Sequence, residues 1–468
     1  MYTIKFGTDG WRAVIAEGYT FDNLERVARA TGQWVLRRTP ENPSAVVGYD
    51  TRFQGAAFAR RTAEVLASMG LRVQLADHFV PTPAVSWATK QYGHAVGVVI
   101  TASHNPPEYS GFKLKLPFGG PAHPAMVAEV EEELGRLGEP AELRSFEALE
   151  REGRVETINL QEAYRHVLRD RLDIEAIRAS GLKVGCDPMY GAGQGTVTDL
   201  LGRERVVEVH DAHNPGMHGQ PPEPIERNLE YLSRLVVEER CDVGLAFDGD
   251  ADRIGMMDAE GRFVDSHKIL ALLVKYLHEE KGLDGTVVKT FSTSDMLDRM
   301  GQHYGLPVET TPIGFKYIAP MIVEGDVLVG GEESGGIAVK GHLPERDGIY
   351  IGLTIVEMMV KRDRSLAELV EELQDAFGPL EYARNDLHTT EEKKQRFLRR
   401  LDQEGLREIA GRPVRRVEDL DGFKFRLDDG WLMFRPSGTE PVLRIYAEAP
   451  TEQDARDLVA AGVALVEG

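Results

Sequence analysis

The chain has 468 residues, with 55 Lys and Arg against 76 Asp and Glu, so its formal net charge is −21. This acidic excess argues against a nucleic-acid-binding protein, which needs a basic face, and no apolar run approaches the roughly 18 residues of a membrane span. The composition is that of an ordinary globular protein, the two cysteines (Cys186 and Cys241) suggest no disulfide framework, and the first residues contain no apolar signal region, so we expect a cytoplasmic protein.

Short apolar runs rich in valine alternate with amphipathic stretches over about the first 370 residues. The runs predict buried strands at 45–50, 95–100, 182–187, 242–248, 285–290 and 326–331. Apolar residues at helical spacing, as in 21–35 and again in 366–377, predict helices between and after these strands. Strands that alternate with helices predict α/β layers with largely parallel sheets.

Changes in composition suggest four domains, at 1–145, 146–257, 258–377 and 378–468. The first boundary lies in the charged stretch 131–154, and the third lies where a helical pattern ends near Pro379. We expect three related α/β domains, although the sequence repeats are too weak to demonstrate copies. The last 90 or so residues contain three strand-like runs and a closing helix from Glu452, which predicts a smaller α+β domain.

Three polar clusters directly follow predicted strands: TASHNP (101–106), DGDADR (248–253) and GEESGG (331–336). In open α/β sheets, ligands bind beyond the carboxyl ends of strands. The repeated placement therefore predicts one cleft that is assembled from several domains.

The second cluster places Asp248, Asp250 and Asp252 at alternate positions. Three close carboxylates repel one another unless a cation neutralises them, and oxygen ligands of this kind suit a hard ion such as Mg²⁺. An EF-hand is excluded because Arg253 and Ala259 stand where its loop needs Gly and Glu. The alternative is a solvated acidic turn with helix-capping aspartates.

The first cluster offers Ser103 beside His104, with Lys113 a short distance along the chain. Serine is a poor nucleophile unless a base or a metal activates it. By this motif alone, Ser103 is equally well explained as a turn or helix-capping residue.

The segment RPSGTEPVLR (435–444) combines a glycine, hydroxyls and arginines, which together suit phosphate oxygens: Arg435, Ser437, Gly438, Thr439 and Arg444. It is not a Walker A loop, and the segment YGAGQGT (190–196) lacks the third glycine of a dinucleotide-binding motif.

Charge balance connects these loops. Two phosphate groups in such a cleft would add about −3 to −4 beside three aspartates, so a divalent cation and clustered cations are needed. Candidate cations in or beside glycine-rich loops are Arg12, Lys113, Arg253, Lys316, Arg435 and Arg444. In GEESGG, Glu332 and Ser334 would then contact sugar hydroxyls; the alternative is a solvated turn.

Six motifs in order resemble the α-D-phosphohexomutase superfamily, the phosphoglucomutases and phosphomannomutases: FGTDGWR (6–12), TASHNPPEYSGFKLK (101–115), DGDADR (248–253), TPIGFK (311–316), GEESGG (331–336) and RPSGTEPVLR (435–444). The resemblance covers nearly the whole chain. It implies a heart-shaped molecule in which three related α/β domains and a smaller α+β domain surround a central cleft.

The same resemblance implies the roles of the site residues. Ser103 would carry the phosphoryl group and, with Asp248, Asp250 and Asp252, hold Mg²⁺. His104 and Lys113 become candidates for general acid–base work, and Arg12 and Arg253 would steady the reacting phosphate. The residues implied in substrate binding are Gly314, Phe315, Lys316, Glu332, Ser334, Arg435, Ser437, Gly438, Thr439 and Arg444.

The implied reaction interconverts glucose 1-phosphate and glucose 6-phosphate through phosphoserine and a bound glucose 1,6-bisphosphate, which also serves as activator. Glu333 and Phe315 are similar to the residues of phosphoglucomutases, whereas mannose-active relatives tend toward GEMSGH. Alternatives are a phosphomannomutase or dual-specificity enzyme, then a phosphoglucosamine mutase. From other classes, a metal-dependent phosphatase and a non-catalytic sugar-phosphate sensor stay open. We expect a monomer or homodimer, with no nucleic-acid or membrane partner.

Overall fold

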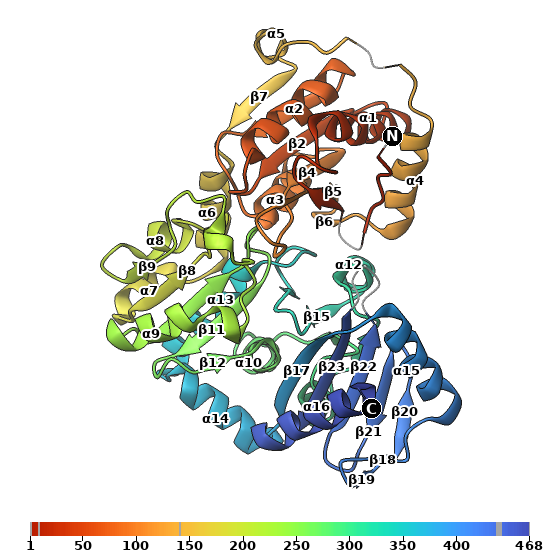
Figure 1. Cartoon of the computed structure of the whole chain (residues 1–468). Helices are drawn as coiled ribbons and strands as arrows, with labels where there is room; N and C mark the ends of the chain where they lie inside the picture. The colour runs from red at the N-terminus through yellow and green to blue at the C-terminus, as the bar shows by residue number, and fades with distance from the viewer. Residues whose placement is uncertain (1, 8–9, 140–141, 437–441, 468) are drawn as a thin grey trace.

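The computed structural model describes residues 2–7, 10–139, 142–436 and 442–467. It confirms three α/β domains followed by an α+β domain (Figure 1). The first domain lies at the top of the view, the second at the left, and the last, in blue, at the lower right.

The first domain is built on a mixed seven-stranded sheet in the order β1-β5-β4-β2-β3-β7, with β6 beside β5. Its strands are β1 (Trp11–Val14), β2 (Ser44–Tyr49), β3 (Arg72–Ala76), β4 (Val96–Ile100), β5 (Tyr109–Leu116), β6 (Gly120–Pro121) and β7 (Val155–Ile158). Its helices are α1 (Phe21–Arg38), α2 (Gly55–Ser68), α3 (Thr82–Gln91), α4 (Pro124–Gly135) and α5 (Phe146–Arg151). Because β7 pairs with β3, this sheet extends past the predicted boundary at 145.

The second domain has a five-stranded sheet in the order β12-β11-β10-β8-β9. Its strands are β8 (Val184–Asp187), β9 (Val206–Glu208), β10 (Val243–Phe247), β11 (Ile254–Asp258) and β12 (Phe263–Val264). Its helices are α6 (Leu160–Arg171), α7 (Ile174–Ser180), α8 (Thr196–Leu201) and α9 (Glu230–Glu238), with the short 3-10 turns η1 (Met217–Gly219) and η2 (Glu226–Asn228). Here too the sheet extends past the predicted boundary, at 257.

The third domain has a four-stranded sheet in the order β14-β13-β15-β16. Its strands are β13 (Thr286–Thr290), β14 (Val308–Thr311), β15 (Val327–Gly331) and β16 (Ile337–Val339). Its helices are α10 (Ser266–Glu279), α11 (Met296–Tyr304), α12 (Phe315–Glu324), α13 (Gly348–Arg362) and α14 (Leu366–Phe377). The apolar spacing that predicted α14 is reinforced by a capping box between Ser365 and Glu368 at its start.

The three sheets share one strand order, which the sequence could not demonstrate. In each, a parallel trio is followed by one antiparallel strand: β3-β2-β4-β5, β9-β8-β10-β11 and β14-β13-β15-β16. The loops after β4, β10 and β15 therefore occupy equivalent places, each between a buried parallel strand and its antiparallel neighbour. These loops are the three polar clusters that the sequence singled out.

The fourth domain has an antiparallel five-stranded sheet in the order β17-β23-β22-β21-β20 and a separate two-stranded hairpin. Its strands are β17 (Glu381–His388), β18 (Glu408–Ile409), β19 (Arg412–Pro413), β20 (Arg416–Glu418), β21 (Phe423–Arg426), β22 (Trp431–Pro436) and β23 (Val442–Ala449). Its helices are α15 (Glu391–Glu404) and α16 (Glu452–Glu467).

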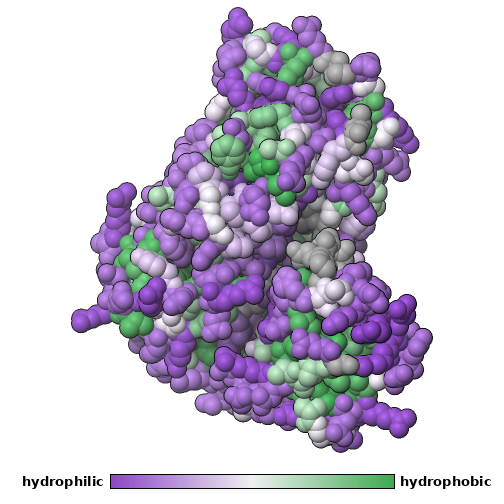
Figure 2. All heavy atoms as spheres, viewed as in Figure 1, coloured by the Kyte–Doolittle hydropathy of each residue, from purple (hydrophilic) through white to green (hydrophobic). Residues whose placement is uncertain are grey.

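Apolar packing joins the domains into one molecule. One buried cluster runs through the first three domains, and a smaller one, which includes Phe291, Trp431 and Tyr446, joins the third domain to the fourth. Figure 2 shows this face of the molecule hollowed between the first and last domains. Among the described residues, no helix has the length and apolar character needed to cross a membrane.

Candidate active site

Ser103 lies in the loop after β4, and its backbone is held in the left-handed region with φ of 55°. Its side-chain oxygen Oγ donates to Asp248 Oδ2 at 2.6 Å, and its backbone N–H donates to Thr101 Oγ1 at 2.8 Å. The residue is 1% exposed. Non-glycine residues with positive φ are uncommon and cluster at functional sites, so this serine is a candidate for chemistry.

The three aspartates predicted to bind metal lie together in the loop after β10, all fully buried. One ligand oxygen from each lies within 4.8 Å of the other two. Lys113, on β5 of the first domain, donates from Nζ to Asp250 Oδ2 at 2.8 Å and to Asp252 Oδ2 at 3.0 Å. We call residues 101–106 the serine loop and residues 248–253 the acidic loop. Ser103 and Asp248 are 145 residues apart in sequence, and their hydrogen bond joins the two loops into one centre.

Burial and mutual repulsion set the charge of this cluster. Burial, with the carboxylates of Asp250 and Asp252, raises the pKa of Asp248 well above its usual range. Burial alone would also raise the pKa of Asp250, but the Lys113 ammonium and the Thr82 hydroxyl outweigh it and hold that pKa below its usual range. The aspartates therefore depend on nearby cations to share this space.

The donor set fits a divalent cation. Within the described ranges, Asp250 Oδ1 and Asp252 Oδ1 are buried and lack a hydrogen-bond partner. Buried polar atoms without partners are uncommon in folded proteins and call for a ligand, a water or an ion. Carboxylate oxygens suit Mg²⁺, so the cluster can hold this ion.

Three further predicted residues lie around Ser103. Arg12, on β1, donates from Nη1 to Asn105 Oδ1 at 2.6 Å. Arg253 ends the acidic loop, and its Nη1 lies 3.8 Å from Glu223 Oε1. Burial and the charges of Arg253 and Arg12 hold the pKa of His104 well below its usual value, so its imidazole is neutral.

The GEESGG loop, after β15, is tied to the acidic loop by Arg346. Arg346 Nη2 donates to Asp252 Oδ2 at 2.7 Å, and its Nη1 lies 3.6 Å from Glu332 Oε2. Burial raises the pKa of Glu332 to about 7 against the opposing charge of Arg346. Glu333 accepts a hydrogen bond from Ser292 Oγ at 2.9 Å, and Ser334 is partly exposed in the same loop.

The TPIGFK segment begins α12, which faces the first domain in Figure 1. Gly314 has φ of +135°, a conformation that favours glycine. Phe315 is buried with the Arg346 guanidinium 5.4 Å from its ring, and Lys316 lies 5.1 Å from the ring of Tyr317. Through Arg346, this segment joins the same centre.

The predicted phosphate-binding arginines lie in the fourth domain. Arg435 on β22 is paired directly opposite Arg444 on β23. Arg435 Nε lies 3.2 Å from Asp421 Oδ2, and Arg444 Nε lies 3.9 Å from Asp386 Oδ1. Ser437, Gly438 and Thr439 lie outside the described residues. No hydrogen bond or ion pair among the described residues joins either arginine to Ser103.

The charge of the GEESGG loop affects one of these two arginines. Although burial opposes it, the charges of Asp421 and Glu333 raise the pKa of Arg435. Glu333 of the third domain thus lies within electrostatic reach of Arg435 in the fourth domain.

Four models of known protein families match the chain in order, and they cover nearly all of it. They describe domains I, II and III of the phosphoglucomutase/phosphomannomutase family, at residues 3–140, 162–261 and 265–377, and its C-terminal domain, at 360–465. The chain belongs to the phosphoglucomutase/phosphomannomutase family.

Individual relatives agree on the family but carry different substrate names. A phosphoglucomutase/phosphomannomutase from Thermococcus kodakarensis is 34% identical over 99% of this chain and 98% of its own. A probable phosphoglucosamine mutase from Pyrococcus furiosus is 32% identical over 99% of this chain and 97% of its own. A crystal structure from Thermus thermophilus, provisionally named a phosphomannomutase, superposes with a TM-score of 0.87 at 37% identity and 99% coverage of both chains.

Sequence reasoning missed two residues that bind the acidic loop of this family member. Thr82, at the start of α3, donates from Oγ1 to Asp250 Oδ2 at 2.5 Å, and Arg346 contacts Asp252. Arg346 follows Glu345 and precedes Asp347 in a charged segment before α13. Such a segment is typical of a solvated turn, and only its burial identifies it as part of the site.

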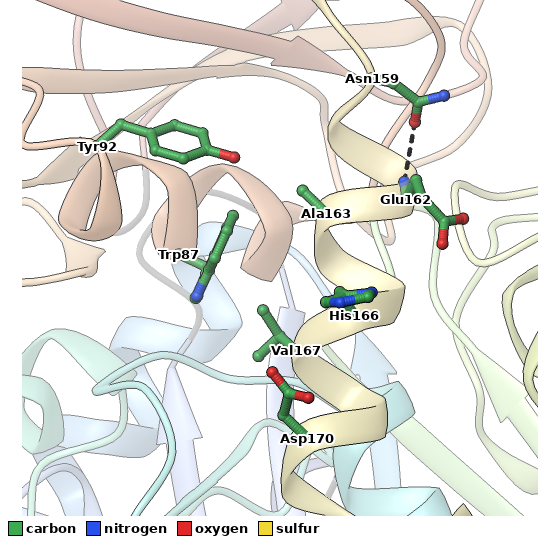
Figure 3. A pocket seen from close by; sticks show the side chains of 8 residues that line it. All are labelled: Trp87, Tyr92, Asn159, Glu162, Ala163, His166, Val167 and Asp170. Carbon is green, nitrogen blue, oxygen red and sulfur yellow. Dashed lines mark hydrogen bonds between the residues drawn. The ribbon is translucent and has the colours of Figure 1, made fainter.

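A cavity of about 490 Å³ lies elsewhere, between α3 and α6. Figure 3 shows Trp87 from α3 beside Ala163 and Val167 from α6, with Tyr92, Asn159, Glu162, His166 and Asp170 around them. None of these side chains is among the predicted site residues, so this cavity is separate from the Ser103 centre.

Proposed function

We propose that the protein is a magnesium-dependent phosphoglucomutase that works through a phosphorylated Ser103. The observation that carries the proposal is the hydrogen bond from Ser103 Oγ to Asp248, inside a buried trio of carboxylates that also contacts Lys113. A structural serine has no need of three buried acids, whose burial is costly unless a cation joins them.

Asp248, Asp250 and Asp252 would hold Mg²⁺ together with an oxygen of phosphoserine 103. Bound there, the ion supplies positive charge that neutralises phosphoryl oxygens during transfer. Arg12, which donates to Asn105, and Arg253, which lies near Glu223, would add their charges beside the reacting phosphate. The chain's own contribution is to position the serine and the acceptor in line.

The first step breaks the bond between phosphorus and Ser103 Oγ and forms one between phosphorus and a sugar hydroxyl, which gives a bound 1,6-bisphosphate. The hydroxyl proton passes to a base within reach of the serine loop, and from that base a proton passes on to the departing Ser103 Oγ. His104 suits this role because it is neutral and its Nδ1 lacks a partner within the described part of the chain. Lys113 is the other candidate, and it would have to release a proton first.

The second step is the reverse transfer from the other end of the sugar. The bisphosphate turns, and its other phosphate passes to Ser103 Oγ. The Ser103 hydroxyl proton passes to the base, and from the base a proton passes to the sugar oxygen that leaves the phosphorus. Arg435, Arg444 and the loop with Ser437, Gly438 and Thr439 would grip the phosphate that is not reacting. We propose that the turn takes place in the hollow between the first and last domains (Figure 2).

For the sugar, we propose glucose, with Glu332, Ser334, Phe315, Gly314 and Lys316 as its contacts. The support is the pair of adjacent glutamates, which the resemblance associates with phosphoglucomutases. Mannose phosphates are the first alternative, since the 34% identical relative has a dual name. Glucosamine phosphate is the second, because the 32% identical relative carries that name.

The test is interconversion of glucose 1-phosphate and glucose 6-phosphate by the purified full chain with Mg²⁺, and by its Ser103→Ala variant. We expect the variant to lose all measurable turnover while its thermal unfolding stays within a few degrees. A Ser294→Ala variant, buried elsewhere in the third domain, serves as the matched control. Full activity in Ser103→Ala would overturn the proposal, and release of free phosphate without isomer would indicate a phosphatase instead.

Assays with mannose and glucosamine 1-phosphates rank the sugars. Intact-mass measurement then shows whether the resting chain carries one phosphate and whether a sugar substrate removes it. We also propose a cytoplasmic enzyme, with glucose 1,6-bisphosphate as its intermediate and activator. Size-exclusion chromatography with light scattering separates monomer from homodimer.

A further inference from the structure

Arg52, in the loop after β2, is buried against the serine loop and has no part in the steps above. Its guanidinium donates to four backbone carbonyls in and just after the serine loop. Nη2 donates to Ser103 O at 2.6 Å and Asn105 O at 2.6 Å, and Nη1 donates to Pro106 O at 2.7 Å and Tyr109 O at 3.0 Å. One side chain thus hydrogen-bonds four backbone carbonyls between Ser103 and Tyr109.

A second path reaches the other side of Ser103. Asp50 accepts from Arg52 through the backbone N–H at 3.0 Å and through Nε at 3.2 Å. Asp50 Oδ2 also accepts from Thr101 Oγ1 at 2.6 Å, and Thr101 Oγ1 accepts from the Ser103 N–H at 2.8 Å. Both the N–H and the C=O of Ser103 are therefore held by one network, which starts at Arg52.

The network is shielded from water, so its bonds do not compete with solvent. Arg52 is 2% exposed, and Asp50 and Thr101 are 1% or less. Burial by itself lowers the pKa of Arg52, and the carboxylates of Asp50 and Asp250 oppose this effect. Hydrogen bonds to a charged group in such surroundings are worth about twice neutral ones.

Ser103 needs such support because its backbone is strained. With φ of 55°, it occupies a region that costs a non-glycine residue free energy and persists only where the surroundings enforce it. Gly249 of the acidic loop also packs against Ser103, since a Cβ added at Gly249 would lie 2.4 Å from Ser103 O. Ser103 therefore contacts both Arg52 and the acidic loop, and its Oγ is directed at Asp248.

We propose that Arg52, with Asp50 and Thr101, positions Ser103 for phosphoryl transfer, and we call these three residues the serine clamp. This inference rests on the proposed function. Without the clamp the loop can relax toward ordinary backbone angles, which moves Oγ out of line with the acceptor. Displacements of about 1 Å from reactive geometry can cost about 10²-fold in rate.

The first test is Arg52→Lys, which keeps the charge but removes the planar fork. We expect kcat to fall about 10²-fold while KM for glucose 1-phosphate stays within about twofold, since the sugar and phosphate contacts lie in other loops. The ³¹P resonance of phosphoserine 103 should also shift. Assays are run well below the unfolding temperature of the variant, so that loss of folded protein does not contribute.

The matched control is Arg299→Lys. Arg299 likewise donates from Nη1 to a backbone carbonyl, that of Phe377 at 2.8 Å, but it lies on α11 in the third domain. We expect this variant to keep its kcat and its ³¹P resonance.

Thr101→Val is the second variant, because it keeps the shape of the side chain while removing both of its hydrogen bonds. If Arg52→Lys does not fold, the Thr101→Val variant alone tests whether the serine clamp positions Ser103. We expect the same loss of kcat with unchanged KM. Folded variants with full kcat, or a loss carried entirely by KM, would overturn the serine clamp. A wild-type chain without mutase activity would instead overturn the proposed function, so the two failures are distinguishable.

Discussion

Lys115 and Glu345 form a buried ion pair that joins the first domain to the segment carrying Arg346. Lys115 Nζ lies 2.6 Å from Glu345 Oε2, and both side chains are 0% exposed. Ser86 Oγ donates to the same carboxylate oxygen at 2.8 Å. Replacing Lys115 by Met therefore leaves a carboxylate inside the protein with only hydroxyl and amide partners.

The expected cost is large because an unpaired buried charge loses its compensation. Removing one partner of such a pair typically costs about 3–5 kcal/mol. At about 2–4 °C per kcal/mol for a unit of 150–250 residues, the unfolding temperature should fall by about 6–20 °C. Adding Glu345→Gln removes the stranded charge, so the double variant should recover most of the loss.

Differential scanning calorimetry at neutral pH measures the first unfolding transition of the parent, both single variants and the double variant. Arg415→Met serves as control, because Arg415 and Asp428 form an ion pair with 58% and 62% exposed side chains, and exposed pairs contribute little. We expect this control to unfold at the parent temperature.

Two results would refute the reasoning. One is a Lys115→Met variant that unfolds within about 2 °C of the parent, which would mean that Glu345 is neutralised or hydrated without its partner. The other is a double variant no more stable than Lys115→Met, which would mean that the lost apolar packing of the lysine stem, rather than the stranded charge, causes the effect.

Three further predictions concern pH, metal and sugar. Burial, with the charge of Arg72, lowers the pKa of His94 to about 4 from 6.5. Between these two pH values the unfolded chain binds a proton at His94 and the folded chain does not, so the stability should fall as the pH drops from about 6.5 to 4. The His94→Gln variant should flatten this part of a plot of unfolding temperature against pH. Chelation by EDTA should abolish mutase turnover in the parent, and MgCl₂ should restore it. In the Asp250→Asn variant, MgCl₂ should not restore turnover. Activity that survives chelation in the parent would contradict the metal assignment. Glu333→Met should raise kcat/KM for mannose 1-phosphate relative to glucose 1-phosphate by about tenfold, and an unchanged ratio would exclude this glutamate from sugar selection.

Many local features of the fold could be predicted from the sequence. The apolar run at 242–248 predicted β10 (Val243–Phe247), and the apolar spacing in 366–377 predicted α14 with its observed bounds. Such patterns are local, because side-chain periodicity follows from the geometry of one helix or strand. The domain boundaries were harder, since β7 joins the first sheet by pairing with β3, some 80 residues earlier.

Some residues of the candidate site could likewise be predicted from the sequence, and others could not. The loops of Ser103 and of the three aspartates were predicted to meet because each follows a buried strand, and the structure brings them into contact. Their roles, like those of Arg435 and Arg444, remain proposals. Arg52 and Arg346 gave no usable signal, because an arginine after a strand or before a helix is ordinarily solvated.

The sequence by itself determined the family, the alternation of strands with helices, and the loops that carry the polar residues, all of which depend on short-range patterns and motifs. Only the tertiary structure decided which charges are buried together: Lys113 with Asp250 across 137 residues, and Arg346 with Asp252 across 94. The physical reason is that burial, and with it the strength of a charge, depends on how distant segments pack. No local pattern reports that packing.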